Sequence, residues 1–210
     1  MYDSFVNIGY FLSLINLILF IKGFSSQDKA FKIFTWYLGI VFCIQMTATV
    51  YVFFSVNNLF LSHFYFIGQL VLLSCFYNTL LKTKAQIYFL KIAFVLGILV
   101  LSIHYYLDPS QFYKFNLFEI AVTSLLVVVF AMLHLYNILA EEKKFYYVTV
   151  GIIMYLLGST VLFFVGNFII GLSAKFKFLT WTLNAILVIV YQLFILFEWK
   201  RSFYKKAIKN

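Results

Sequence analysis

Proline, cysteine and charged residues are scarce in this sequence of 210 residues. It has one proline and two cysteines, and 11% of its residues are charged, whereas roughly a quarter are charged in a soluble domain. This composition excludes an ordinary soluble globular protein. No polar stretch between its apolar runs is long enough to form a separate soluble domain. Cys43 and Cys75 lie in apolar segments without paired spacing, so we expect each to be a small buried hydrophobic residue.

Several functional motifs are also missing. There is no GxSxG elbow, P-loop or GxGxxG sequence, and we find no internal repeat of the kind seen in many transporters. The seventh apolar run has no central lysine for a retinal Schiff base. His63, His104 and Glu119 lie in different runs and form no HxxxH or HExxH pair, so we expect no metal and no cofactor.

Apolar residues are abundant instead. They make up 64% of the chain, and they gather into runs close to the roughly 20 residues that a helix needs to cross a bilayer. The runs are Phe5 to Ile21, Phe31 to Phe54, Leu59 to Leu81, Ile87 to Leu107, Asn116 to Leu139, Tyr146 to Ile170 and Phe178 to Trp199. The sequence therefore predicts an all-α integral membrane protein. We expect a seven-transmembrane-helix bundle over residues 1–199 and a short basic cytoplasmic tail over residues 200–210.

The basic residues are distributed unevenly between the two sides of this predicted bundle. Of the 16 Lys and Arg residues, only Lys114, Lys175 and Lys177 fall on one side. By the positive-inside rule, the N-terminus is then outside the cytoplasm and the C-terminus is inside. The formal net charge of +9 is concentrated in short loops and the tail, where anionic lipid headgroups explain it. We therefore expect membrane lipid, and no nucleic acid, as a partner.

Glu119 is the only carboxylate well inside an apolar run. At 100° per residue, Glu119 and Thr123 share a narrow stripe with Phe130, His134 and Asn137. An ionisable group inside a membrane is costly unless it faces protein or water. We therefore predict a ligand-binding pocket in the outer half of the bundle, with Phe130, His134 and Asn137 as a coupling stripe. The predicted pocket residues are His63, Gln69, His104, Glu119, Thr123, Asn167, Thr180 and Asn184.

For Glu119, hydrogen bonding between packed helices is as good an explanation as a ligand-binding role. For the individual Asn, Gln and Thr residues this packing explanation is favoured, because such bonds are common and modest in energy. A basic segment, Trp199 to Lys209, either anchors the chain to lipid or docks onto another protein.

The seven spans, the outside N-terminus, the minimal loops and this basic segment resemble the seven-helix sensor modules of bacteria. Stretches such as IKGFSSQDKAFKIFTWYL resemble membrane proteins of Bacteroidetes. The resemblance implies a sensor or receptor-like signalling module in the bacterial cytoplasmic (inner) membrane, or an accessory subunit of a membrane complex. It would work with a separate signalling protein or membrane-complex subunit at the cytoplasmic face. The alternative is an intramembrane hydrolase acting on a lipid or hydrophobic substrate, using Glu119 with His63 or His104.

Overall fold

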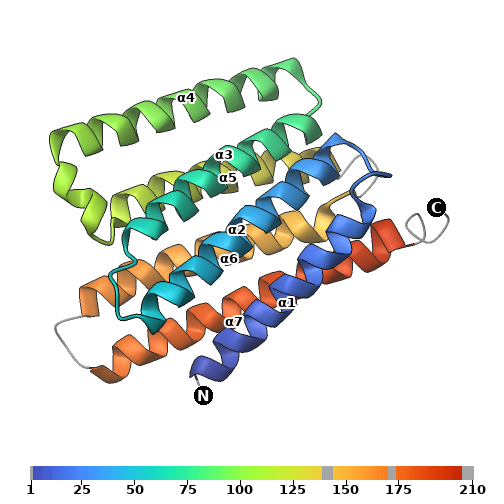
Figure 1. Ribbon diagram of the computed structural model, residues 1–210. Coiled ribbons are helices and arrows are strands. Elements are labelled where there is room, and N and C mark those ends of the chain that lie inside the picture. The colour runs from blue at the N-terminus through green and yellow to red at the C-terminus, as the bar shows by residue number, and fades with distance from the viewer. Residues whose placement is uncertain (1, 139–143, 170–173, 205–210) are drawn as a thin grey trace. The chain divides into compact units, whose positions relative to one another are not determined.

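The computed structural model describes residues 2–138, 144–169 and 174–204. Within these residues the chain is helical, with no strand (Figure 1). The long helices are α1 (Tyr2–Gly23), α2 (Lys29–Phe53), α3 (Phe60–Leu80), α4 (Lys84–Leu107), α5 (Leu117–Ile138), α6 (Tyr146–Ile169) and α7 (Ala174–Glu198). A 3₁₀ helix, η1 (Pro109–Tyr113), lies between α4 and α5, and a π-helical turn, η2 (Trp199–Phe203), follows α7.

Seven of the described helices are long and apolar enough to cross a membrane. This confirms the predicted helical class and the seven apolar segments, and it indicates an integral membrane protein. The predicted orientation of the termini stays a prediction. Of the predicted basic tail, residues 200–204 continue the last helix, and residues 205–210 lie outside the described part of the chain.

The chain divides into two compact units. The first comprises Met1–Asp28 and His134–Asn210, and the second comprises Lys29–Leu133. Each unit has its own buried core.

The first unit is organised by close contacts of α7 with α1 and α6. Asn16 on α1 donates from Nδ2 to the backbone carbonyl and to the side-chain oxygen of Gln192 on α7, at 2.9 and 2.8 Å. Gly151 on α6 lies so close to α7 that an added Cβ would be 2.8 Å from the Cβ of Phe194. Glycine lets the two helix backbones approach this closely.

Glu198 at the end of α7 holds the start of α6. Its carboxylate accepts the backbone N–H groups of Phe145 and Tyr147, at 3.0 and 2.8 Å. A helix begins with N–H groups that have no partner within the helix, and a carboxylate satisfies them well. Phe145 has a left-handed backbone, with φ of 57°, and its ring is fully buried against Phe203. The last turn of α7 and the first turn of α6 are thus fixed together.

In the second unit, α2 packs against α3, and α4 packs against both α3 and α5. Phe34 of α2 and Phe76 of α3 lie with ring centroids 5.2 Å apart, and both are fully buried. Gly97 of α4 faces Leu126 of α5. Cys43 of α2 and Cys75 of α3 are free and exposed, so the expectation that they are buried was wrong. Because both segments are apolar all round, sequence periodicity does not separate a lipid-facing cysteine from a core one.

Candidate functional site

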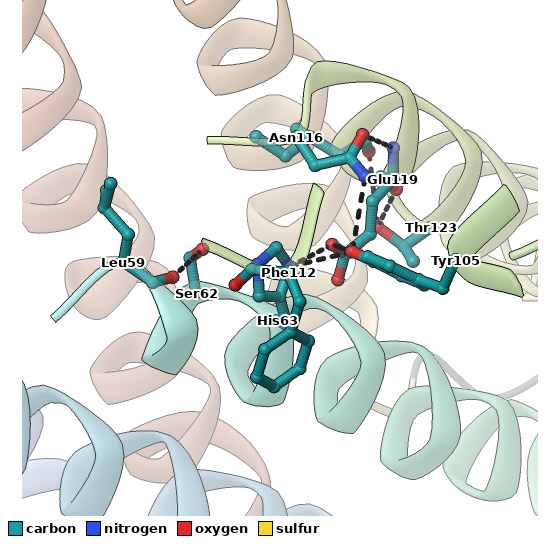
Figure 2. Close-up of polar contacts among 9 residues, drawn as sticks. Leu59, Ser62, His63, Tyr105, Phe112, Asn116, Glu119 and Thr123 are labelled. Atoms are coloured by element: carbon teal, nitrogen blue, oxygen red, sulfur yellow. Dashed lines mark hydrogen bonds and ion pairs between the residues drawn. The ribbon is translucent and has the colours of Figure 1, made fainter. Parts of the chain in front are cut away.

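Polar side chains gather where α3 and α5 begin and α4 ends, beneath η1 (Figure 2). Asn116 precedes the first residue of α5, and its Oδ1 accepts the backbone N–H of Glu119 at 3.1 Å. An N-cap residue with Glu three positions later is the pattern of a capping box, in which the glutamate folds back onto the start of its own helix. Here the Glu119 carboxylate turns instead toward His63 and Tyr105. The Glu119 side chain therefore bonds to other helices and does not cap its own.

His63 and Glu119 form a buried pair. The Nδ1 atom of His63 lies 2.5 Å from Oε2 of Glu119, and the two side chains are 2% and 1% exposed. The other ring nitrogen, Nε2, lies 2.9 Å from the backbone carbonyl oxygen of Phe112. A carbonyl oxygen only accepts, so Nε2 carries a hydrogen and donates it to Phe112. The short contact at Nδ1 then requires one further proton between the imidazole and the carboxylate.

Tyr105 completes the cluster from the last turn of α4. Its hydroxyl contacts Oε2 of Glu119 and lies 2.8 Å from Nδ1 of His63 (Figure 2). The Nδ2 group of Asn116 donates to the same hydroxyl oxygen at 3.3 Å. A hydroxyl has a single hydrogen, so Tyr105 donates to one of its two acceptors at a time.

An aromatic cover lies over this cluster. The ring of Phe112 on η1 stacks on the ring of His63, with centroids 5.0 Å apart and an angle of 24° between the planes. Phe64 and Tyr105 contact the same phenyl ring edge-on. Phe112 therefore holds His63 through its carbonyl and shields it through its side chain.

The second oxygen of the buried Glu119 carboxylate takes no part in these contacts. Oε1 of Glu119 is buried and has no hydrogen-bond partner among the described residues. A buried polar atom without a partner costs about 1–3 kcal/mol, and more when the group is charged. A ligand that brings an N–H or O–H donor to Oε1 would remove this cost.

The other residues predicted for the pocket in the second unit do not join the side-chain hydrogen bonds of this cluster in the described structure. Thr123 donates to the backbone carbonyl of Glu119 at 2.8 Å, within its own helix. Gln69 is buried on α3, and its Oε1 has no partner. His104 packs its ring on Phe118 at 4.9 Å, and its Nε2 has no partner.

The remaining predicted residues belong to the first unit. Asn167 on α6 is exposed, Thr180 on α7 is buried beside Gly166, and Asn184 is half-buried. The predicted pocket combining all eight residues stays a prediction. Of the coupling stripe on α5, Phe130 is fully buried, Asn137 is half-buried, and His134 uses its Nε2 for a 3.2 Å contact with the backbone oxygen of Lys144.

Tyr105, Asn116 and Phe112 were not predicted as site residues. The spacing of Asn116 and Glu119 gives a signal, because it is a helix-capping pattern. Tyr105 near a span end looks like an ordinary interfacial aromatic residue, and a backbone carbonyl such as that of Phe112 has no sequence signal. Among the described residues, no group of three or more His, Cys, Asp or Glu side chains could hold a metal ion. Comparison of this chain with protein-family models, with curated proteins and with solved structures gives no match.

Proposed function

We propose that this protein is a seven-helix membrane sensor or receptor-like module, or an accessory subunit of a membrane complex, that binds a small or lipid-like ligand at Glu119. The observation that supports it is the buried carboxylate, which is held by His63 and Tyr105 through one oxygen while the other has no partner in the part of the chain that the structure describes. Helix packing alone would favour full pairing of so costly a group.

The proposed orientation places this cluster on the outer side of a bacterial cytoplasmic membrane. Lys114 is the only basic residue between α4 and α5, whereas the opposite ends of the spans carry most of the Lys and Arg residues. A ligand would then enter from outside the cytoplasm. Output would pass along α5, through the Phe130 to Asn137 stripe, to a separate partner at the cytoplasmic face.

Cysteine labelling tests the orientation. In a chain with Cys43 and Cys75 replaced by serine, Ser110→Cys in η1 and Ser25→Cys between α1 and α2 are compared, because both positions are exposed. A charged thiol reagent added to intact cells should modify the first variant, and the second only after the membrane is permeabilised. The reverse pattern would invert the proposed topology.

Mass spectrometry of the purified protein tests the ligand site. The full chain is extracted in a gentle detergent as wild type and as Glu119→Gln, and everything that remains bound is identified. A retained small molecule that is lost from the folded variant supports the site. A co-purifying protein with no small ligand, unchanged in the variant, would make Glu119 structural and this chain a subunit.

The contact between His63 and Glu119 favours one second candidate, an intramembrane hydrolase that uses these two groups as acid and base. His104 does not share hydrogen bonds with Glu119 in the described structure, so His63 would be the partner. Both ring nitrogens of His63 are engaged, so catalysis would require Phe112 to move away. A hydrolase should lose all turnover in a folded Glu119→Gln variant.

A further inference from the structure

We propose that the ligand of the Glu119 site is a small protonated amine, and that it binds in exchange for one proton. This inference rests on the proposed function, because it assigns a ligand class to the same site. It is carried by the heavy-atom positions of His63, Tyr105 and Glu119 (Figure 2).

The first step is the number of protons that the contacts between His63, Glu119 and Phe112 require. Nε2 of His63 donates to Phe112, and one more proton lies between Nδ1 and Oε2 of Glu119. With that proton the pair has no net charge, whether the proton belongs to the imidazole or to the carboxyl. A cation entering beside Oε1 would therefore bury one uncompensated positive charge, which is expensive.

The second step is what happens when that proton leaves. Tyr105 is within reach of both acceptors, so its hydroxyl can turn from Oε2 of Glu119 to Nδ1 of His63, 2.8 Å away. The carboxylate then draws back from Nδ1 and from the hydroxyl oxygen, because neither short contact with Oε2 still holds a hydrogen. His63 is then neutral, with both nitrogens still bonded, and Glu119 is an anion with both oxygens open to a new donor. One proton goes to solvent, one monocation enters, and the net charge stays zero.

The third step is the choice of cation. A primary ammonium group has three N–H donors on a compact charge, and it is attracted to aromatic faces. Here the carboxylate supplies two acceptors, Tyr105 contacts it, and the ring of Phe112 stacks on His63 beside it. Hard metal cations require about six or more oxygen ligands. The hydrogen-bonded cluster offers far fewer, and no multi-residue metal group occurs among the described residues.

The other ionisable groups near this site do not bond to the pair of His63 and Glu119. On α4, His104 packs against the Tyr105 ring at 5.6 Å. On the connection that carries η1, Lys114 donates to Ser110 and Asp108 bonds to Ser110 and Gln111, and those groups are exposed or only part-buried. The exchangeable proton is thus assigned to the His63 and Glu119 pair.

Calorimetry of the full chain in detergent tests the exchange. Propylammonium is compared with 1-propanol, a neutral probe of similar size, in buffers of different ionisation enthalpy. We expect one proton released for each propylammonium bound, an affinity that rises about tenfold per pH unit while the proton is displaced, and much weaker binding of 1-propanol. Glu119→Gln should abolish both binding and proton release. Asp3→Asn removes an exposed carboxylate from α1 and should change neither.

A measurement on the wild type covers the case in which Glu119→Gln does not fold. The chain has three histidines, so their ¹⁵N resonances can be assigned. With propylammonium bound, Nδ1 of His63 should carry no proton and share none with Glu119, while the Nε2 proton stays in place. Binding without proton release, or equal affinity for 1-propanol, would overturn the inference. If propylammonium does not bind but the purified protein retains another ligand that requires Glu119, the inference fails and the proposed function stands.

Discussion

The site depends on the hydroxyl group of Tyr105, which contacts Glu119, His63 and Asn116. Tyr105→Phe should lower the free energy of unfolding by about 1–2 kcal/mol, because it removes hydrogen bonds to the buried pair of His63 and Glu119. A denaturant titration of the detergent-solubilised protein measures this change.

Its neighbour gives a matched control. Tyr106 is 85% exposed, so Tyr106→Phe should change the free energy of unfolding by less than about 0.5 kcal/mol. Equal effects of the two substitutions would mean that the cluster around Glu119 contributes nothing to stability.

Sequence reasoning at this scale predicted Glu119 and His63 as site residues but not the partners that the structure places beside them. A carboxylate inside an apolar run is conspicuous because burying it is costly. The partners depend on how η1 returns the chain across the ends of α3 and α5, and this determines that Phe112 meets His63. No periodicity in the sequence encodes that path. The predicted sharing of the site by His104 and Glu119 likewise depended on the side-chain directions at the end of α4.

At the scale of elements, glycine positions separate close helix contacts from open ones. An added Cβ at Gly151 would lie 2.8 Å from the Cβ of Phe194, whereas at Gly68 nothing lies within 4 Å. Gly151→Ala should therefore lower the free energy of unfolding by about 1–3 kcal/mol, because α6 must move away from α7. Gly68→Ala should cause no loss, since alanine favours helix by up to about 1 kcal/mol. Unfolding titrations of both variants would contradict this if Gly68→Ala proved the more damaging.

The turn into η1 should respond to acid. Asp108 accepts from the Ser110 hydroxyl, from the Gln111 side chain and from the Ser110 backbone N–H, and these hydrogen bonds hold the pKa of the Asp108 carboxyl below its usual 3.8. A carboxyl with a lowered pKa in the folded state stabilises above the unfolded value, and this contribution is lost as pH falls through the folded value.

Hydrogen exchange of the Ser110 amide measures that loss. After correction for the intrinsic rate, its protection should decrease as pH falls below about 4. Asp108→Asn keeps an acceptor that does not titrate, so its protection should not depend on pH in this range. A wild type with constant protection would show that the Asp108 contacts do not hold the turn.

The helices themselves were predicted well because their signal is local. Each apolar run is long enough to cross a bilayer, and each corresponds to a helix in the described residues. Which faces of these helices pack together is harder to predict from the sequence. The runs are apolar on nearly every side, so lipid-facing and buried positions have the same composition, as Cys43 and Cys75 show.

At the scale of the whole molecule, these two cysteines test immersion in a membrane. Both are exposed at the surface of the protein, in apolar helices. In native membranes a charged thiol reagent should leave them unmodified, because lipid excludes the reagent and disfavours the reactive thiolate. After detergent extraction and denaturation both should react. Rapid modification of Cys43 in intact membranes would place α2 in water, outside the bilayer.

The first compact unit is assembled from the two ends of the chain, and this affects how the protein is made. Helix α1 leaves the ribosome well before its partner α7, which begins about 150 residues later. Gln192 follows Asn16 by 176 residues, so at roughly 5–20 residues per second about 9–35 s pass before the two side chains can meet. The second unit, formed by consecutive helices, is complete by then. During synthesis α1 thus lacks its contacts with α7 until that later helix has been made.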